Sequence, residues 1–261
     1  MTTYQKLSQQ PLVFVLAEFR FSPILEMEKY IPTLQDELRQ EFPLIDTQQN
    51  QEFQISPSGI GINTTTEWVL QSKSKKQAIT LNSNRLVYVT SEYDRFDGFK
   101  RQCKKALEAF IKIVNPSLWL RIGLRYNDAI TEENNENIEE YVQSFLYASN
   151  SLSSVGEMNQ HINEIVLETA EGCMVVRSMY AHKALPMWPD MMLPIKIEAN
   201  NHMATRIFLD FDHFWDINLS QESDNPDFKL DDLILKLEKM HEYSRKAFWD
   251  ITTDKGKSKW N

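Results

Sequence analysis

Two stretches of the chain have the apolar and polar alternation that is typical of β-strands, 12–21 (LVFVLAEFRF) and 118–130 (LWLRIGLRYNDAI). Each contains an arginine between two apolar or aromatic residues, in the triplets FRF and LRY, whose arginines are Arg20 and Arg125. Because the two patterns are alike, we predict that the stretches form paired strands at the centre of a sheet.

A similar series of elements follows each of these strands. After the first, apolar residues at helical spacing predict a helix between 23 and 43 and another over 96–113. After the second, the spacing predicts a helix around 138–145 and a long closing helix over about 227–250. Alternating segments between these helices predict short antiparallel strands, which lie at 53–55, 67–71, 78–81, 86–90, 162–169, 174–180, 193–198 and 206–211.

The order of these elements predicts an α+β fold made of two similar halves, 1–116 and 117–261, either tightly packed together or forming a single domain. Each half is expected to contain a strand, a helix, about four antiparallel strands and a second helix, with the helices packed on one face of the sheet. We interpret the repeated order as an internal duplication, in which the halves join through their two opening strands.

The composition is that of an ordinary globular protein, with 261 residues, 42% hydrophobic residues and a formal net charge of -9. The negative charge disfavours nucleic acid as a partner, because contacts with phosphates require a basic surface. Lys73, Lys75 and Lys76 lie in a predicted turn near the lysine-rich helix over 96–113. This basic cluster is compatible with a local contact to a nucleic-acid backbone, and equally with a solvated face.

The compartment is predicted to be the cytoplasm, without a membrane segment. The first residues, MTTYQKLSQQ, lack the apolar core of a signal peptide, and no window approaches 18 uninterrupted apolar residues. The two cysteines, Cys103 and Cys173, are too few for a disulfide framework or a cysteine zinc site, so we interpret them as buried thiols.

Several short segments together resemble a known family. They are PLVFVLAEFRFSP, EYDRF, RIGLRYND, FLDFD and HEYSRKAFWDIT, and they occur in order over nearly the whole chain. The set resembles a sporadically distributed, functionally uncharacterised bacterial family with a central RIGLRY-type strand. Asn127 and Asp128 stand here where that family has an aliphatic residue and then an asparagine. The resemblance implies the same fold and no particular activity, and the family's sporadic distribution suggests a component of a stress or mobile defence module.

Charged residues gather on one face of the two predicted central strands. A period of two places Arg121, Arg125 and Asn127 on one face of the second strand, and Glu18 and Arg20 on one face of the first. These five residues could form an anion or nucleotide pocket, because guanidinium groups bind planar carboxylates and phosphates. Alternatively, Glu18 forms a structural ion pair with Arg121 or Arg125 inside a buried polar layer.

No metal centre or cofactor site is predicted. Asp210 and Asp212 share a strand face and could hold a hard cation, but no third ligand is fixed by spacing, and a polar strand end explains them as well. The five histidines have no pair at the i, i+4 spacing of a helical zinc site, and we interpret them as surface residues. They are His161, His182, His202, His213 and His241.

The segment 180–192 (YAHKALPMWPDMM) is unusually rich in methionine, proline and tryptophan for a connection between strands. Such side chains adapt to the surfaces of partner proteins. We therefore predict a docking loop, with packing over the molecule's own sheet edge as the alternative. The residues that would contact a partner are Met187, Trp188, Met191 and Met192.

The sequence contains no nucleophile elbow around a serine, as in hydrolases, and no glycine-rich phosphate-binding loop. This absence favours a non-enzymatic binding or regulatory component that has a protein partner or forms a homo-oligomer. The alternative is an enzyme or a sensor that binds a small anionic ligand on the arginine-lined face, or a metal-dependent hydrolase that uses Asp210 and Asp212.

Overall fold

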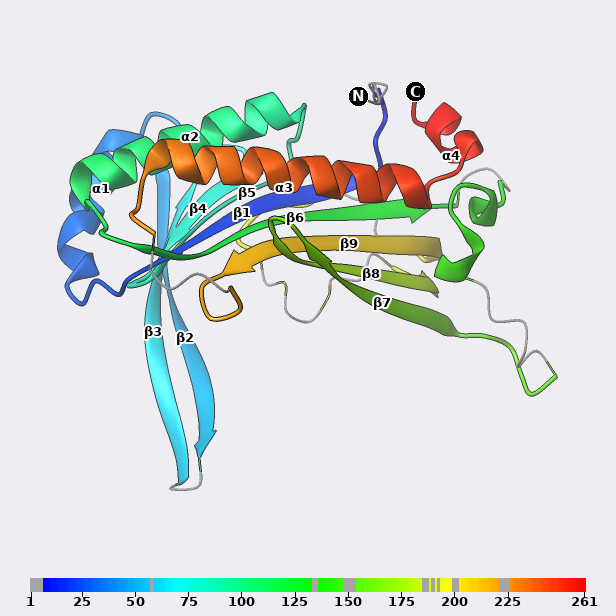
Figure 1. Ribbon diagram of the computed structural model, residues 1–261, viewed down its shortest axis with the longest axis horizontal. Coiled ribbons are helices and arrows are strands. Elements are labelled where there is room, and N and C mark those ends of the chain that lie inside the picture. The colour runs from blue at the N-terminus through cyan, green and yellow to red at the C-terminus, as the bar shows by residue number, and fades with distance from the viewer. Residues whose placement is uncertain are drawn as a thin grey trace.

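In the computed structural model, helices cover one face of a single antiparallel sheet, and a long hairpin projects from one end of that sheet (Figure 1). The structure describes residues 7–56, 59–132, 136–147, 154–184, 188, 191, 193–198, 202–220 and 226–261. Within these ranges, side chains are described except in 50–56 and 59–63.

Nine strands of the described chain form the sheet in the order β2-β3-β4-β5-β1-β6-β9-β8-β7. The predicted pairing of the two opening strands is confirmed, because β1 and β6 are antiparallel neighbours with Glu18 opposite Gly123 and Arg20 opposite Arg121. The strands are β1 Leu12–Phe21, β2 Leu44–Ser56, β3 Gly59–Gln71, β4 Gln77–Leu81, β5 Arg85–Thr90, β6 Trp119–Thr131, β7 Gln160–Thr169, β8 Gly172–Lys183 and β9 Ala204–Asp216.

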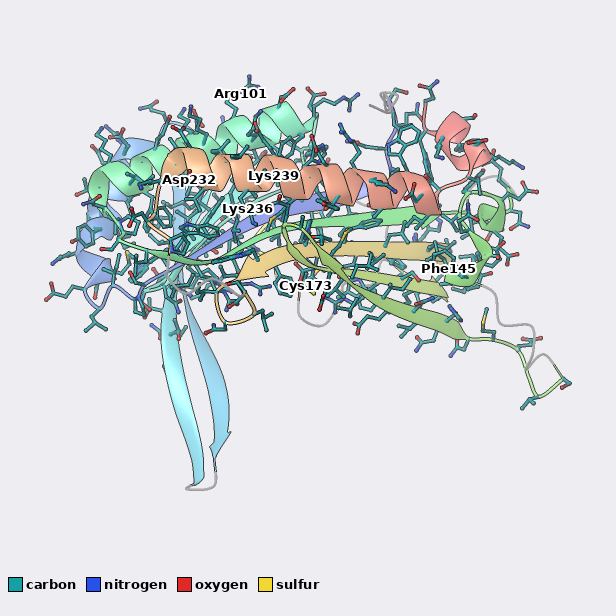
Figure 2. The ribbon with its side chains drawn as sticks, viewed as in Figure 1. Arg101, Phe145, Cys173, Asp232, Lys236 and Lys239 are labelled. Carbon is teal, nitrogen blue, oxygen red and sulfur yellow. The ribbon has the colours of Figure 1, made fainter. Side chains whose placement is uncertain are left out.

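The helices bury their apolar sides against this sheet. In α2, Phe99, Cys103, Leu107 and Phe110 recur at helical spacing and are buried, whereas Arg101 is exposed on the other side (Figure 2). Asp232 is likewise exposed on α3 (Figure 2). The helices are η1 Met27–Tyr30, α1 Ile31–Leu38, α2 Phe96–Ile113, η2 Ile138–Glu140, η3 Ser144–Leu146, α3 Leu230–Ile251 and α4 Asp254–Lys259.

The two faces of the sheet differ in chemistry because successive side chains of a strand point to opposite sides. On β6, Ile122, Leu124 and Tyr126 lie on the helix-covered face, in the main core. Arg121 and Arg125 lie on the other side, which we call the opposite face. Part of the opposite face is covered by residues 188, 191 and 193–198, whose apolar side chains pack on a second cluster formed by Val13, Phe14, Val69, Ala78 and Val89.

The predicted architecture of two similar halves is wrong, because the described chain forms one nine-stranded sheet in which the two series of elements differ. The helix expected around 138–145 is replaced by the short turns η2 and η3. Between and beside these turns the backbone pairs with the end of α3, since Val142 bridges Thr252 and the Gln143 amide donates to the Ile251 carbonyl over 2.9 Å. These tertiary bonds replace the intrahelical bonds that the spacing predicted.

The strand expected at 193–198 is also absent from the described sheet. This segment crosses the opposite face, where the Lys196 amide donates to the Lys75 carbonyl over 2.6 Å and Gln71 Nε2 donates to the Pro194 carbonyl over 2.6 Å. In addition, β2 and β3 pair over their whole length, although only Trp68–Gln71 of β3 pairs with β4. The rest of this hairpin extends beyond the sheet (Figure 1) and has no counterpart after β6.

Both cysteines are free thiols. Cys103 lies on the buried side of α2, and Cys173 is half-buried on β8 (Figure 2). Within the described ranges, no helix combines the length and the apolar character that crossing a membrane requires.

Candidate functional site

A chain of ion pairs runs across five strands on the opposite face. Arg85 Nη2 lies 2.6 Å from Glu67 Oε1, and Arg85 Nη1 lies 3.7 Å from Glu18 Oε2. Arg121 Nε then lies 3.1 Å from Glu18 Oε1, and Arg121 Nη1 lies 3.4 Å from Asp216 Oδ2. The ion pair between Glu18 and Arg121 that the sequence offered as the structural alternative is therefore present. Arg20 also pairs with Glu18, over 2.9 Å.

Arg125 belongs to a second, more buried cluster and does not pair with Glu18. Its Nε and Nη2 atoms donate to the two carboxylate oxygens of Asp210 over 2.7 and 2.8 Å. Arg177 Nε donates to the same carboxylate over 3.0 Å. The Asp210 side chain is fully buried, so this carboxylate is satisfied by two arginines inside the protein.

These contacts make the opposite face a poor anion site. Five arginines of these clusters are each bonded to a carboxylate of the protein, so an anionic ligand would have to displace an existing partner. They are Arg20, Arg85, Arg121, Arg125 and Arg177. Asn127 lies in the same layer, opposite Asp210, and is buried. The five predicted ligand-binding residues, Glu18, Arg20, Arg121, Arg125 and Asn127, thus lie on one face. Glu18, Arg20 and Arg121 belong to the first ion-pair cluster, Arg125 belongs to the second, and Asn127 lies beside the second.

Asp210 and Asp212 share the face expected for them, but they are not equivalent. The oxygens of Asp210 are taken by Arg125 and Arg177, whereas burial raises the pKa of Asp212. Across the residues that the structure describes, no group of three histidine, cysteine or acidic side chains is placed to hold a metal ion.

The predicted docking residues Trp188 and Met191 are buried against the opposite face, with 9% and 5% of their surface exposed. The Arg177 guanidinium lies 5.2 Å from the centre of the Trp188 ring, which connects this segment to the Asp210 cluster. Two of the four predicted contact residues, Met187 and Met192, lie outside the described residues.

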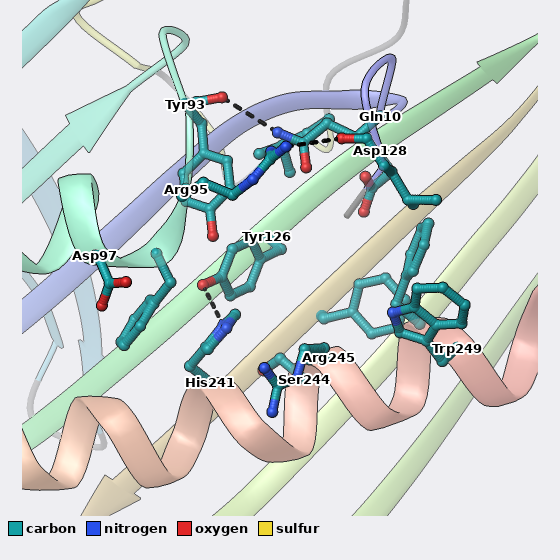
Figure 3. Close-up of a pocket in the computed structure, with 15 residues that line it drawn as sticks. Gln10, Tyr93, Arg95, Asp97, Tyr126, Asp128, His241, Ser244, Arg245 and Trp249 are labelled. Carbon is teal, nitrogen blue, oxygen red and sulfur yellow. Dashed lines mark hydrogen bonds between the residues drawn. The ribbon is translucent and has the colours of Figure 1, made fainter. Parts of the chain in front are cut away.

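A cavity lies on the other side of the sheet, between its helix-covered face and α3 (Figure 3). Its volume is about 340 Å³, within the range that small-ligand sites occupy. Segments from distant parts of the sequence form its walls. The lining residues are Leu7, Gln10, Leu12, Tyr93, Arg95, Phe96, Asp97, Tyr126, Asp128, Phe211, His241, Ser244, Arg245, Phe248 and Trp249.

Aromatic contacts hold one end of this cavity in place. The Tyr126 hydroxyl and His241 Nδ1 are hydrogen bonded over 2.8 Å (Figure 3). The Phe96 ring stacks on His241 with a centroid distance of 4.0 Å and an interplanar angle of 6°, and Tyr93 meets Tyr126 edge to face at 5.9 Å. These residues join the start of α2, strand β6 and helix α3.

The segment that precedes β1 closes another side of the cavity. Arg95 Nη2 donates to the Leu7 carbonyl over 3.1 Å, and Gln10 Nε2 donates to the Tyr93 carbonyl over 3.2 Å (Figure 3). The Gln9 amide donates to the Trp260 carbonyl over 2.9 Å. The segment before β1 therefore forms part of the cavity wall, and the bond from Gln9 attaches this segment to the C-terminal end of the described chain.

The carboxyl group of Asp128 and the imidazole of His241, which both line the cavity, have strongly shifted pKa values. Burial, followed by the nearby negative charge of Asp210, raises the pKa of Asp128 from 3.8 to about 7. Burial, followed by the positive charge of Arg245, lowers the pKa of His241 from 6.5 to about 3. At neutral pH the imidazole is therefore uncharged, and the Asp128 carboxyl is close to half ionised.

Asp128 is the unusual group of the cavity. It is 5% exposed, and among the described residues no hydrogen bond acts on the pKa of its carboxyl group, which is shifted by burial and by the charge of Asp210. A carboxyl group in such surroundings is costly to bury unless a partner satisfies it. Strongly shifted carboxyl groups in cavities are typical of functional sites. Asp128 and the aromatic walls around it form the candidate site.

The sequence interpretation missed this site. It treated Asp128 only as a departure from the family pattern and His241 as a surface residue. A signal was present, because Asp128 shares the parity of Ile122, Leu124 and Tyr126, where alternation requires an apolar residue. The surface interpretation of the histidines is right for His182 and His202, which are exposed.

The prediction of a surface position is wrong for His213, which is fully buried. Its ring is hydrogen bonded to Thr169 Oγ1 over 2.9 Å and to the Met240 carbonyl over 3.2 Å. His241 is half-buried and enclosed by the contacts described above.

Comparison with known proteins found no match to any family model, any curated protein or any solved structure. The resemblance to the bacterial family with a RIGLRY-type strand therefore stays a prediction from the sequence.

Proposed function

We propose that this protein is a non-enzymatic binding or regulatory protein that binds a small organic molecule in the cavity between the sheet and α3. The observation that carries the proposal is the buried carboxyl group of Asp128, with no hydrogen bond or positive charge of the described residues acting on its pKa, inside a cavity of about 340 Å³ with several aromatic side chains in its walls. Small-ligand sites combine an apolar surface with a few polar groups that fix the ligand's orientation.

The distribution of charge supports this location over the arginine-lined face that the sequence favoured for a small ligand. On the opposite face, Arg121 and Arg125 are bonded to carboxylates of the protein at distances of 2.7 to 3.4 Å. In the cavity, Asp128 has no such partner within the described chain. A ligand can thus contribute a bond in the cavity without breaking one.

Native mass spectrometry of the protein purified from its own cells tests the proposal. The parent protein should retain a small molecule. Ser244→Phe should lose it, because Ser244 lines the cavity, is 3% exposed and would place a ring in the space that the ligand needs. Glu242→Phe is the matched control, since it adds the same ring two residues away on the exposed side of α3.

Retention of the molecule by the parent and by Glu242→Phe, but not by Ser244→Phe, supports the proposal, provided that all three proteins melt cooperatively. Equal retention by Ser244→Phe would contradict it. A retained protein chain instead of a small molecule would favour a function through a protein partner or a second copy of this chain.

Asp128 also supports a second candidate function, that of an enzyme. A carboxyl group with a pKa of about 7 suits general acid–base catalysis near neutral pH. If the retained molecule is a substrate, Asp128→Asn should bind it and fail to convert it. Conversion by the parent protein alone would identify an enzyme, whereas recovery of the unchanged molecule from both proteins supports the binding function.

We propose that the protein acts in the cytoplasm, because its two cysteines are free thiols, which are typical of a reducing compartment. Its involvement in a stress or defence module rests on the family resemblance.

A further inference from the structure

We propose that the ligand of this cavity is an organic cation, a protonated amine or amidine whose N–H group pairs with the Asp128 carboxylate while its body lies among the aromatic rings. This inference rests on the proposed function, because it specifies the chemistry of the same site. It follows from the surroundings of Asp128 on each side.

The first support is the set of rings that share the cavity with Asp128. Tyr126 precedes it by two residues on the same face of β6, and Phe211 lies on the neighbouring strand opposite Tyr126. Phe248 and Trp249 come from α3, and Trp249 is labelled in Figure 3. Aromatic faces carry negative potential and attract cations. They do not attract anions in the same way.

The second support is that Asp128 lacks a positively charged neighbour. The cavity is lined by two arginines, but Arg95 donates to the carbonyl groups of Leu7 and Asp94 over 3.1 and 2.6 Å. Arg245 acts on the other end of the cavity, where it lowers the pKa of His241. Within the described chain, the charge that shifts the pKa of Asp128 is the negative charge of Asp210 from across the sheet. The position beside Asp128 therefore favours a cation.

Binding of a cation at this position must depend on pH, because only the ionised carboxyl group forms the ion pair. Titratable and charged groups from several elements surround Asp128. They are Tyr93 and Arg95 just before α2, Asp97 in α2, Tyr126 on β6, Asp210 on β9, and His241 and Arg245 on α3. Burial raises the pKa of Tyr93 to about 12, and the pKa of His241 is about 3. Of Tyr93, Asp128 and His241, Asp128 is thus the group that changes charge between pH 5 and 9.

The inference can be tested with three small probes of the same ring size and different charge, benzamidine, benzamide and benzoate, by isothermal titration calorimetry at pH 8. Benzamidine should bind at least about tenfold more tightly than the neutral and anionic probes. Its affinity should fall by about tenfold for each pH unit below 7, as Asp128 becomes protonated.

Asp128→Asn should weaken benzamidine binding by at least about tenfold and remove the pH dependence. Asp232→Asn is the matched control, because it removes the same charge at an exposed position of α3 and should leave the affinity unchanged. Ser244→Phe should abolish binding of every probe that enters the cavity.

The outcomes separate this inference from the proposed function. If benzamide or benzoate binds as tightly as benzamidine and Ser244→Phe blocks it, the cavity is a ligand site and the cation inference is wrong. If Asp128→Asn binds benzamidine like the parent, the inference is also wrong. If no probe binds in a manner that Ser244→Phe abolishes, both the inference and the cavity's role fail.

Discussion

Replacing Asp128 with asparagine should change how the stability of this protein depends on pH. Asp128 is buried on the helix-covered face, and its pKa is raised from 3.8 to about 7. Asparagine has nearly the same shape and cannot ionise. The substitution therefore removes one titration and leaves the packing of the cavity wall nearly unchanged.

The direction of the effect follows from which state of the protein holds the proton. Between about pH 4 and pH 7, folded Asp128 keeps a proton that the unfolded chain has released, so the free energy of unfolding decreases as the pH rises and then levels off. A shift of about three pKa units corresponds to roughly 4 kcal/mol. Relative to the parent, Asp128→Asn should therefore gain up to roughly 4 kcal/mol between about pH 4 and pH 8.

Urea denaturation of both proteins at intervals of pH measures this difference directly. The comparison with the parent is essential because His241 acts in the opposite direction. Its pKa is lowered from 6.5 to about 3, so stability is lost as the pH falls below 6.5. This contribution is common to both proteins and cancels in the difference between them.

A stability difference that stays constant from about pH 4 to pH 8 would refute the reasoning, because it would mean that Asp128 titrates alike in the folded and unfolded states. Asp232→Asn is the matched control, since it replaces the same side chain at an exposed position of α3.

Three further predictions concern the two faces of the sheet. Arg125→Ala should lower the free energy of unfolding, measured by urea denaturation, by about 3–5 kcal/mol, because it leaves the fully buried Asp210 with one fewer partner. Arg20→Ala should lower it by less than about 1 kcal/mol, because 46% of the Arg20 side chain is exposed. His241→Phe should become more stable relative to the parent as the pH falls from 6.5 towards 3, and an unchanged acid denaturation midpoint would contradict this. Trp188→Ala should cost about 3 kcal/mol and expose the segment 188–198 to proteolysis, and protease resistance equal to that of the parent would show that the segment does not depend on this ring.

The sequence was sufficient for the elements whose pattern is dictated by their own period. The strands β1 and β6 and the helices α2 and α3 each bury one regular set of positions, and their predicted pairing or extent agrees with the structure. The helix around 138–145 and the strand at 193–198 were wrong because tertiary contacts decide them. Val142 pairs with Thr252 at the end of α3, and Lys196 bonds to Lys75 in a distant turn.

The candidate site divides in the same way. Alternation correctly placed Arg121 and Arg125 on one face, because parity within a strand needs no knowledge of the rest of the molecule. It could not show that Asp210, rather than Glu18, satisfies Arg125, since that depends on which strands lie beside β6. The cavity could not be predicted from the sequence, because residues as distant in the chain as Leu7, Tyr126 and His241 form its walls only after folding.

The most direct test of the ligand site is a crystal structure of the protein with benzamidine at pH 8. The account predicts electron density for the probe in the cavity between the sheet and α3, with its amidinium group within hydrogen-bond distance of the Asp128 carboxylate and its ring against the aromatic walls. Density for the probe only on the opposite face, or a cavity without the probe at a saturating concentration, would contradict it.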